Sequence, residues 1–189
     1  MKRLSAVFAI SLVLVTLGVA QPSNKPKEKD GILFQYVGQV TNSGTDSAQY
    51  GNLLEVAGQN TTSNFTFYTS CTTVNVVNNG SIRVINRVGT TTIYAASSAG
   101  DFSNPDSFRS GTPVQVSDLK QQVIVDTATG AFTVLNFNTI TSVASTGSDG
   151  DEDTLGEVGQ RFRTVLTGHL NPGMPPPSGW FGGYALSVK

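Results

Sequence analysis

Residues 121–143, QQVIVDTATGAFTVLNFNTITSV, decide the fold because they encode two strands joined by a turn. Residues 123–125 are β-branched, and residues 126–130 supply turn chemistry in which Gly130 is free to take a positive φ. An apolar pattern then resumes at Phe132. A two-stranded hairpin is only marginally stable alone, so the sequence predicts further strands that pack against it.

The same signals recur along the rest of the chain, which carries no amphipathic helical pattern. Asn78-Asn79-Gly80 predicts a second tight hairpin, and Gly89 is expected to break the strand that follows it. About ten or eleven short strands are expected in total. Besides the central hairpin, they cover residues 32–40, 50–57, 65–70, 74–77, 82–88, 90–95, 160–170 and 180–188.

These patterns predict one all-β antiparallel domain. An up-and-down β-barrel is preferred because most connections between sequential strands are short, and a two-sheet β-sandwich is the alternative. The expected shape is similar to the small exported barrels of the calycin and allene-oxide-cyclase kind. No residue role is transferred from this similarity of shape.

The start of the chain predicts export. Residues 1–20 combine a basic start, a short apolar run and small residues before Gln21, which is typical of a cleaved secretory signal peptide. Residues 21–30 are charged and proline-containing and are expected to form a flexible tail, with the β-domain over residues 31–189. A secreted or periplasmic protein with no membrane span after signal cleavage is therefore expected.

The charge balance limits the classes of binding partner, and the cysteine count limits the disulfides that the chain can form. From Gly31 onward the chain has seven Lys or Arg and eleven Asp or Glu, so nucleic-acid binding is not expected. Cys71 is the single cysteine and cannot form an internal disulfide. Its two interpretations are a small buried side chain and a thiol that pairs between chains.

Alternation assigns the two faces of the strand predicted at residues 82–88. Ile82, Val84 and Val88 share one face of their strand, and Arg83 and Arg87 share the other, which is interpreted as the solvent side rather than an anion site. Residues 96–119 form the longest stretch without periodicity. We expect Phe102 and Phe108 to pack this stretch on the rim of the fold rather than leave it as a binding lid.

The most acidic segment is a candidate metal site. Asp149, Asp151 and Asp153 recur at every second residue and Glu157 follows, so their oxygens could converge on calcium. The match to a calcium loop is partial, and a solvated acidic loop is the alternative. No cofactor other than calcium is expected.

Residue types that carry catalysis are sparse. His169 is the only histidine and is predicted to face outward, and no local signature of a catalytic triad occurs. Glu55 is the one charged residue within an apolar strand, so it is the candidate for a buried carboxylate. No catalytic residue is assigned.

Three functions remain from the sequence. The first is an exported, non-enzymatic domain with a binding or structural role toward an extracellular partner. The second is a barrel that binds a small apolar ligand, and the third is a cyclase- or isomerase-like barrel enzyme that uses Glu55. The residues expected to line the ligand site are Phe34, Tyr36, Glu55, Phe65, Phe67 and Trp180.

Overall fold

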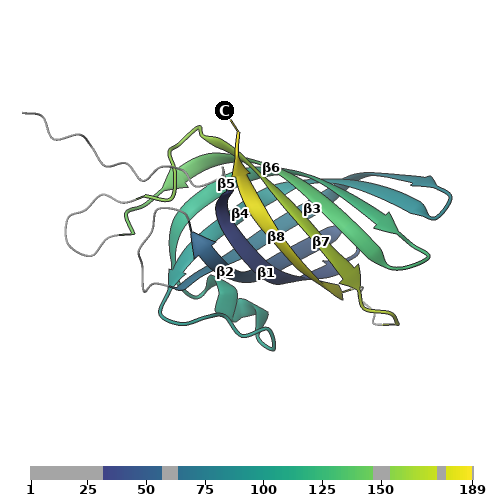
Figure 1. Cartoon of the computed structure of the whole chain (residues 1–189), viewed down its shortest axis with the longest axis horizontal. Coiled ribbons are helices and arrows are strands. Elements are labelled where there is room, and N and C mark those ends of the chain that lie inside the picture. Colours follow the sequence, from purple (N-terminus) through teal and green to yellow (C-terminus); the bar gives the residue numbers. More distant parts are fainter. Residues whose placement is uncertain (1–31, 57–63, 147–153, 174–177, 189) are drawn as a thin grey trace, which may run out of the picture.

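The computed structural model describes residues 32–56, 64–146, 154–173 and 178–188, which form a closed, eight-stranded antiparallel barrel (Figure 1). Each strand pairs with the next in the chain, and β8 pairs with β1 to close the ring. The up-and-down barrel preferred from the sequence is therefore confirmed over the sandwich. In chain order the strands are β1 (Ile32–Ser43), β2 (Asp46–Val56), β3 (Asn64–Asn79), β4 (Ile82–Ala96), β5 (Thr112–Asp126), β6 (Ala131–Val143), β7 (Arg161–Leu170) and β8 (Ser178–Ser187).

The strands are fewer and longer than the sequence predicts. Gly89 does not break a strand, because β4 runs through it and pairs with Cys71 of β3 and Leu119 of β5. A glycine within a strand can also mark a close approach of two backbones, and that is its role here. The central hairpin is confirmed as β5 and β6, with Gly130 at a φ of 77° in the connecting turn.

The barrel interior is filled by inward-facing side chains of alternate positions. Aromatic and branched residues from strands that are not neighbours meet there, for example Tyr36 of β1 and Phe67 of β3 with ring centroids 5.3 Å apart. The main cluster of buried residues consists of Tyr36, Val40, Phe65, Phe67, Ile93, Val114, Val123, Val125, Phe132, Val134, Leu155, Leu166 and Phe181. This core, rather than any disulfide, holds the fold together, since Cys71 is free.

The segment between β4 and β5 folds back on the outside of the barrel, where Figure 1 shows it beside β2. It contains a short 3₁₀ helix, η1 (Pro105–Arg109), whose Phe108 side chain is fully buried. Thr66 donates a hydrogen bond to the Phe108 carbonyl at 2.9 Å, and the Phe108 ring packs on Tyr50. Phe102 packs on Trp180 of β8. The expectation that Phe102 and Phe108 pack this segment is confirmed.

The end of the barrel that holds the β6–β7 connection is closed by residues 154–160. Leu155 is buried in the main core, and its carbonyl accepts a hydrogen bond from the Gln115 side-chain amide. The Gly159 and Ile140 backbones are also hydrogen bonded, at 2.8 Å. The opposite end holds the tight turns between β1 and β2, β3 and β4, and β5 and β6, and we call it the hairpin end.

Two sequence predictions fall on residues that the structure does not describe. The predicted signal peptide and tail at residues 1–30 are outside the described ranges, as are Asp149, Asp151 and Asp153. In the described part of the chain, no helix is both long enough and apolar enough to cross a bilayer.

Two strand glycines give a test of the packing. A Cβ atom on Gly51 would collide with the Val37 carbonyl and the Phe67 ring, whereas one on Gly182 would meet nothing closer than the Tyr36 carbonyl at 3.9 Å. We expect Gly51→Ala to lower the free energy of unfolding by about 2 kcal/mol, because the overlap must be relieved by moving backbone. Gly182→Ala should change it by less than about 0.5 kcal/mol. Urea unfolding of both variants measures the difference, and equal effects would contradict the packing described here.

Candidate functional site

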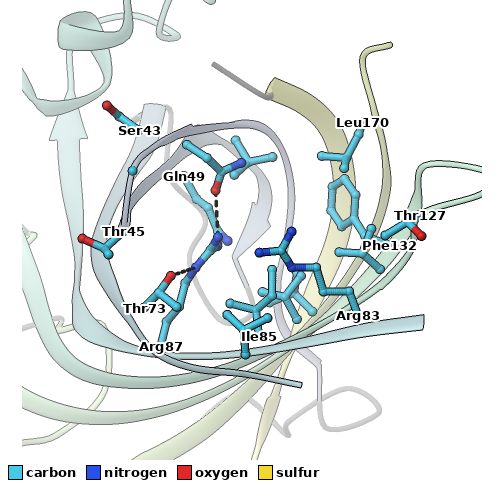
Figure 2. Close-up of a pocket in the computed structure, with 17 residues that line it drawn as sticks. Ser43, Thr45, Gln49, Thr73, Arg83, Ile85, Arg87, Thr127, Phe132 and Leu170 are labelled. Carbon is cyan, nitrogen blue, oxygen red and sulfur yellow. Dashed lines mark hydrogen bonds between the residues drawn. The ribbon is translucent and has the colours of Figure 1, made fainter. Parts of the chain in front are cut away.

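A cavity of about 720 Å³ lies inside the barrel at the hairpin end. Every strand except β8 contributes to its lining, together with the β1–β2 and β5–β6 turns. The 17 lining residues are Val40, Asn42, Ser43, Gly44, Thr45, Gln49, Thr73, Val76, Arg83, Ile85, Arg87, Val123, Val125, Thr127, Phe132, Val134 and Leu170 (Figure 2). They include two arginines and no acidic residue.

The lining is divided by chemistry. One side, which we call the apolar wall, is formed by Val123 and Val125 of β5, Phe132 and Val134 of β6, and Leu170 of β7. Amide and hydroxyl side chains dominate the side formed by β1 to β3 and their turns. A ligand with an apolar body and a polar head would therefore find a matching surface for each part.

Arg87 lies at the base of the cavity and is 8% exposed. Its Nη1 donates to Ser47 Oγ at 3.0 Å and to Gln121 Oε1 at 3.3 Å. Nη2 donates to Asn42 Oδ1 at 2.8 Å, and Nε donates to Thr73 Oγ1 at 3.3 Å (Figure 2). All four acceptors are neutral, so the guanidinium is held in place without a countercharge. Burial lowers the pKa of Arg87, and the like charge of Arg83 adds to that effect.

The hydrogen bonds of Arg87 continue across the barrel. The Gln121 amide donates to Asn136 Oδ1 at 2.9 Å, and the Asn136 amide donates to Thr164 Oγ1 at 2.8 Å. The resulting polar layer joins seven of the eight strands, all except β8. Its members are Asn42, Ser47, Thr73, Arg87, Gln121, Asn136 and Thr164.

Arg83 lies two inward-facing positions nearer the mouth than Arg87, with Ile85 between them, and its side chain is exposed. Figure 2 shows its guanidinium pointing into the cavity toward that of Arg87. Among the described residues, the one ion pair joins Arg109 to Asp106, so neither cavity arginine is neutralised by a carboxylate there. The cavity therefore carries two positive charges on one side.

The solvent-side interpretation of Arg83 and Arg87 is wrong. Both side chains line the interior, and the apolar residues that alternate with them face outward, with Ile82 39% and Val88 49% exposed. Alternation correctly separated the two faces of the strand. It misassigned them because the interior of this barrel is polar at the depth of Arg87, whereas the rule assumes an apolar interior.

Below the polar layer the interior is packed. A void of about 20 Å³ remains there, which is the size of one water molecule. The Tyr36 hydroxyl and Asn138 Oδ1 are buried and have no hydrogen-bond partner in the described part of the protein. Burial raises the pKa of Tyr36, and the nearby Thr164 hydroxyl opposes the shift without reaching hydrogen-bond geometry. Of these two cavities, the one at the hairpin end is the larger.

The residues predicted to line a ligand site lie elsewhere. Tyr36 and Phe67 face inward but belong to the packed core, where they line the small void with the half-buried Phe34. Phe65 is buried in the same core. Trp180 is 51% exposed on the outer surface against Phe102, since Phe181 takes the inward position. The backbone of Glu55 pairs with Gln35, and its side chain is outside the described set.

The remaining candidates do not assemble into a second site. Glu157 is exposed, and the described residues contain no group of three or more His, Cys, Asp or Glu placed to hold a metal ion. The calcium prediction remains a prediction, because its three aspartates are not described. His169 is exposed, as predicted, and its Nδ1 lies 2.9 Å from the Leu170 carbonyl oxygen.

Comparison with protein-family models, with curated proteins and with solved structures found no match for this chain. Function is therefore argued from the cavity and its side chains.

Arg87 is expected to be a structural residue of the polar layer. Arg87→Met removes four donors, which are those to the buried Ser47 and Gln121 and to the half-buried Asn42 and Thr73. We expect the free energy of unfolding to fall by about 2–4 kcal/mol. Arg83→Met, which breaks no hydrogen bond of this layer, should leave stability unchanged or slightly increased. Chemical denaturation of the two variants tests this, and an equally stable Arg87→Met protein would contradict a structural role.

Cys71 gives a second test of the same interior. Its thiol is 3% exposed, and its Sγ lies 3.4 Å from the Ser47 carbonyl oxygen, which confirms the small buried side chain. Burial raises the pKa of Cys71, with Arg87 acting in the opposite direction, so the thiolate fraction at neutral pH is lower than for an ordinary thiol. We expect iodoacetamide to alkylate the native protein far more slowly than the urea-unfolded chain. Equal rates would show that the thiol is accessible.

Proposed function

We propose that this domain is an exported, non-enzymatic binding protein that holds one small ligand with an apolar body in the cavity at the hairpin end of the barrel. The observation that carries the proposal is the cavity itself. Its volume of about 720 Å³ lies within the range of roughly 300–1,000 Å³ found for small-molecule sites. Its apolar wall and the convergent polar side chains opposite also resemble features of such sites.

The contrast between the two halves of the barrel supports this assignment. The half below the polar layer is packed around Tyr36, Phe67 and Phe181, with space for about one water. A barrel of eight strands is narrow enough for side chains to fill it or to leave room for one small ligand. The same barrel therefore does both, one at each end.

A cyclase- or isomerase-like activity is the weaker candidate. It would need a carboxylate or another base among the residues that line the cavity. The 17 lining residues, all in the described part of the chain, include no Asp, Glu, His, Cys or Tyr. Positioned donors and an apolar surface suit binding better than proton transfer.

A pair of adjacent valines on β3 tests the location of the ligand. Val76 lines the cavity, and Val77 is 52% exposed on the outer face of the same strand. We expect N-phenyl-1-naphthylamine, an uncharged dye that fluoresces in apolar surroundings, to bind the wild-type protein with an increase in emission. Val76→Trp should weaken dye binding at least about tenfold, since the indole occupies the cavity and lost apolar contact of this size is worth ~1.4 kcal/mol or more.

Val77→Trp is the matched control and should bind the dye like the wild type. Native mass spectrometry of protein purified from its own host should show a retained small molecule, and this mass should be absent in Val76→Trp. A wild-type protein that neither binds the dye nor retains a ligand would rule out the proposed function. Equal binding by both tryptophan variants would place the ligand outside this cavity.

A further inference from the structure

The two arginines of the cavity suggest what kind of ligand it takes. Arg83 and Arg87 are two of the six described Lys and Arg residues, and they share a single cavity that has no acidic lining residue. Two cations that face one another raise each other's energy, and a third charge of opposite sign between them would remove this repulsion. Both side chains would therefore attract an anion that enters the cavity.

The donors of the two side chains differ in what they still offer. Arg87 uses four of its five N–H groups on Ser47, Gln121, Asn42 and Thr73, which fixes its position. Arg83 makes no hydrogen bond or ion pair within the described structure and points into the cavity (Figure 2). Arg87 thus supplies a fixed positive charge at the base, and Arg83 supplies a free fork of donors nearer the mouth.

We propose that the cavity selects an organic anion, with an apolar body on the wall formed by β5 to β7 and one anionic head between Arg83 and Arg87. This inference rests on the proposed binding function and names its ligand class. A guanidinium fork matches the oxygens of a carboxylate or a phosphate, and such charge-assisted hydrogen bonds are stronger than neutral ones. The apolar wall contacts the body and contributes affinity without selecting its charge.

The geometry also gives a direction to the bound ligand. The apolar wall begins beside the arginines, because β5 pairs with β4 and Val125 is in register with Arg83. It continues away from them through Phe132 and Val134 of β6 and Leu170 of β7. An anion held at the arginines therefore extends its body along this wall toward β6 and β7. A cationic head would be repelled from the same place, and a neutral head would leave the positive charges uncompensated.

Competition with matched ten-carbon ligands tests the inference. Decanoate, 1-decanol and decylamine share a body and differ in charge, and each is titrated against N-phenyl-1-naphthylamine bound to the intact mature protein, below its micelle-forming concentration or solubility limit. We expect decanoate to displace the dye at a concentration roughly tenfold lower than 1-decanol requires, since charge-assisted hydrogen bonds are stronger than neutral ones. Decylamine should be the weakest competitor. Decyl phosphate, tested alongside, distinguishes a phosphate head from a carboxylate head, and a preference for either supports the anion.

The variant Arg83→Met tests whether Arg83 is the residue that binds the anionic head of the ligand. It should remove most of the difference between decanoate and 1-decanol, and dye binding by the same variant shows whether the apolar wall still accepts a ligand. Arg161→Met removes an exposed arginine of β7 that lies outside the cavity, and it should keep the full difference. Equal displacement by decanoate and 1-decanol in the wild type would overturn the inference while the binding function stands. Failure of the dye to bind any protein would overturn both.

Discussion

The buried guanidinium of Arg87 is the constraint on which the rest of the barrel depends. A cation can remain 8% exposed only if its donors are satisfied, and four neutral acceptors from four other strands satisfy them. Gln121 and Asn136 extend the same chain of hydrogen bonds to β7. The polar layer thereby fixes the register of seven strands at one depth, which the non-directional packing of aromatic rings below it cannot do.

The same layer separates two regions with different physical roles. Beneath it, rings of β1, β3 and β8 meet at centroid distances of 5.3–6.3 Å and fill the interior. Above it, the side chains that line the wall are smaller, and a cavity remains. Stability is thus concentrated at the closed end, where Leu155 completes the core. The ligand that we propose would bind at the hairpin end, so a rigid scaffold would position the binding region.

The fold could be read from the sequence, whereas the candidate site could not. Alternation around the Val123 hairpin and the clustering of turn residues specify antiparallel strands of sequential pairing, and the barrel follows. The prediction for Gly89 was wrong because a glycine that breaks a strand and one that lets two strands approach look identical in sequence.

The prediction for the arginine face was wrong for a different reason. Alternation with a period of two separates the two faces of β4 but does not say which face points into the barrel. The more apolar face, with Val84, Val88 and Ile82, points outward. Trp180 was misplaced by the same ambiguity, since Phe181 beside it takes the core position. The signal that could have identified the arginines is the pairing of Arg87 with Gln121, because polar residues at paired positions of two adjacent strands share one face.

Closure of the ring has a consequence for how the protein reaches its native state. β1 and β8 come from opposite ends of the domain, yet they are hydrogen-bonded neighbours over most of their length. The paired residues are far apart in the sequence, so a long loop must be closed before their hydrogen bonds form, at a cost in chain entropy. Folding is therefore expected to be slow compared with that of helical domains of this size. Until β8 has been synthesised, β1 and β7 each present an open edge able to pair with another chain. Pairing of β8 with both β7 and β1 removes the two edges together, so the completed ring has no open strand edge to which another chain could add.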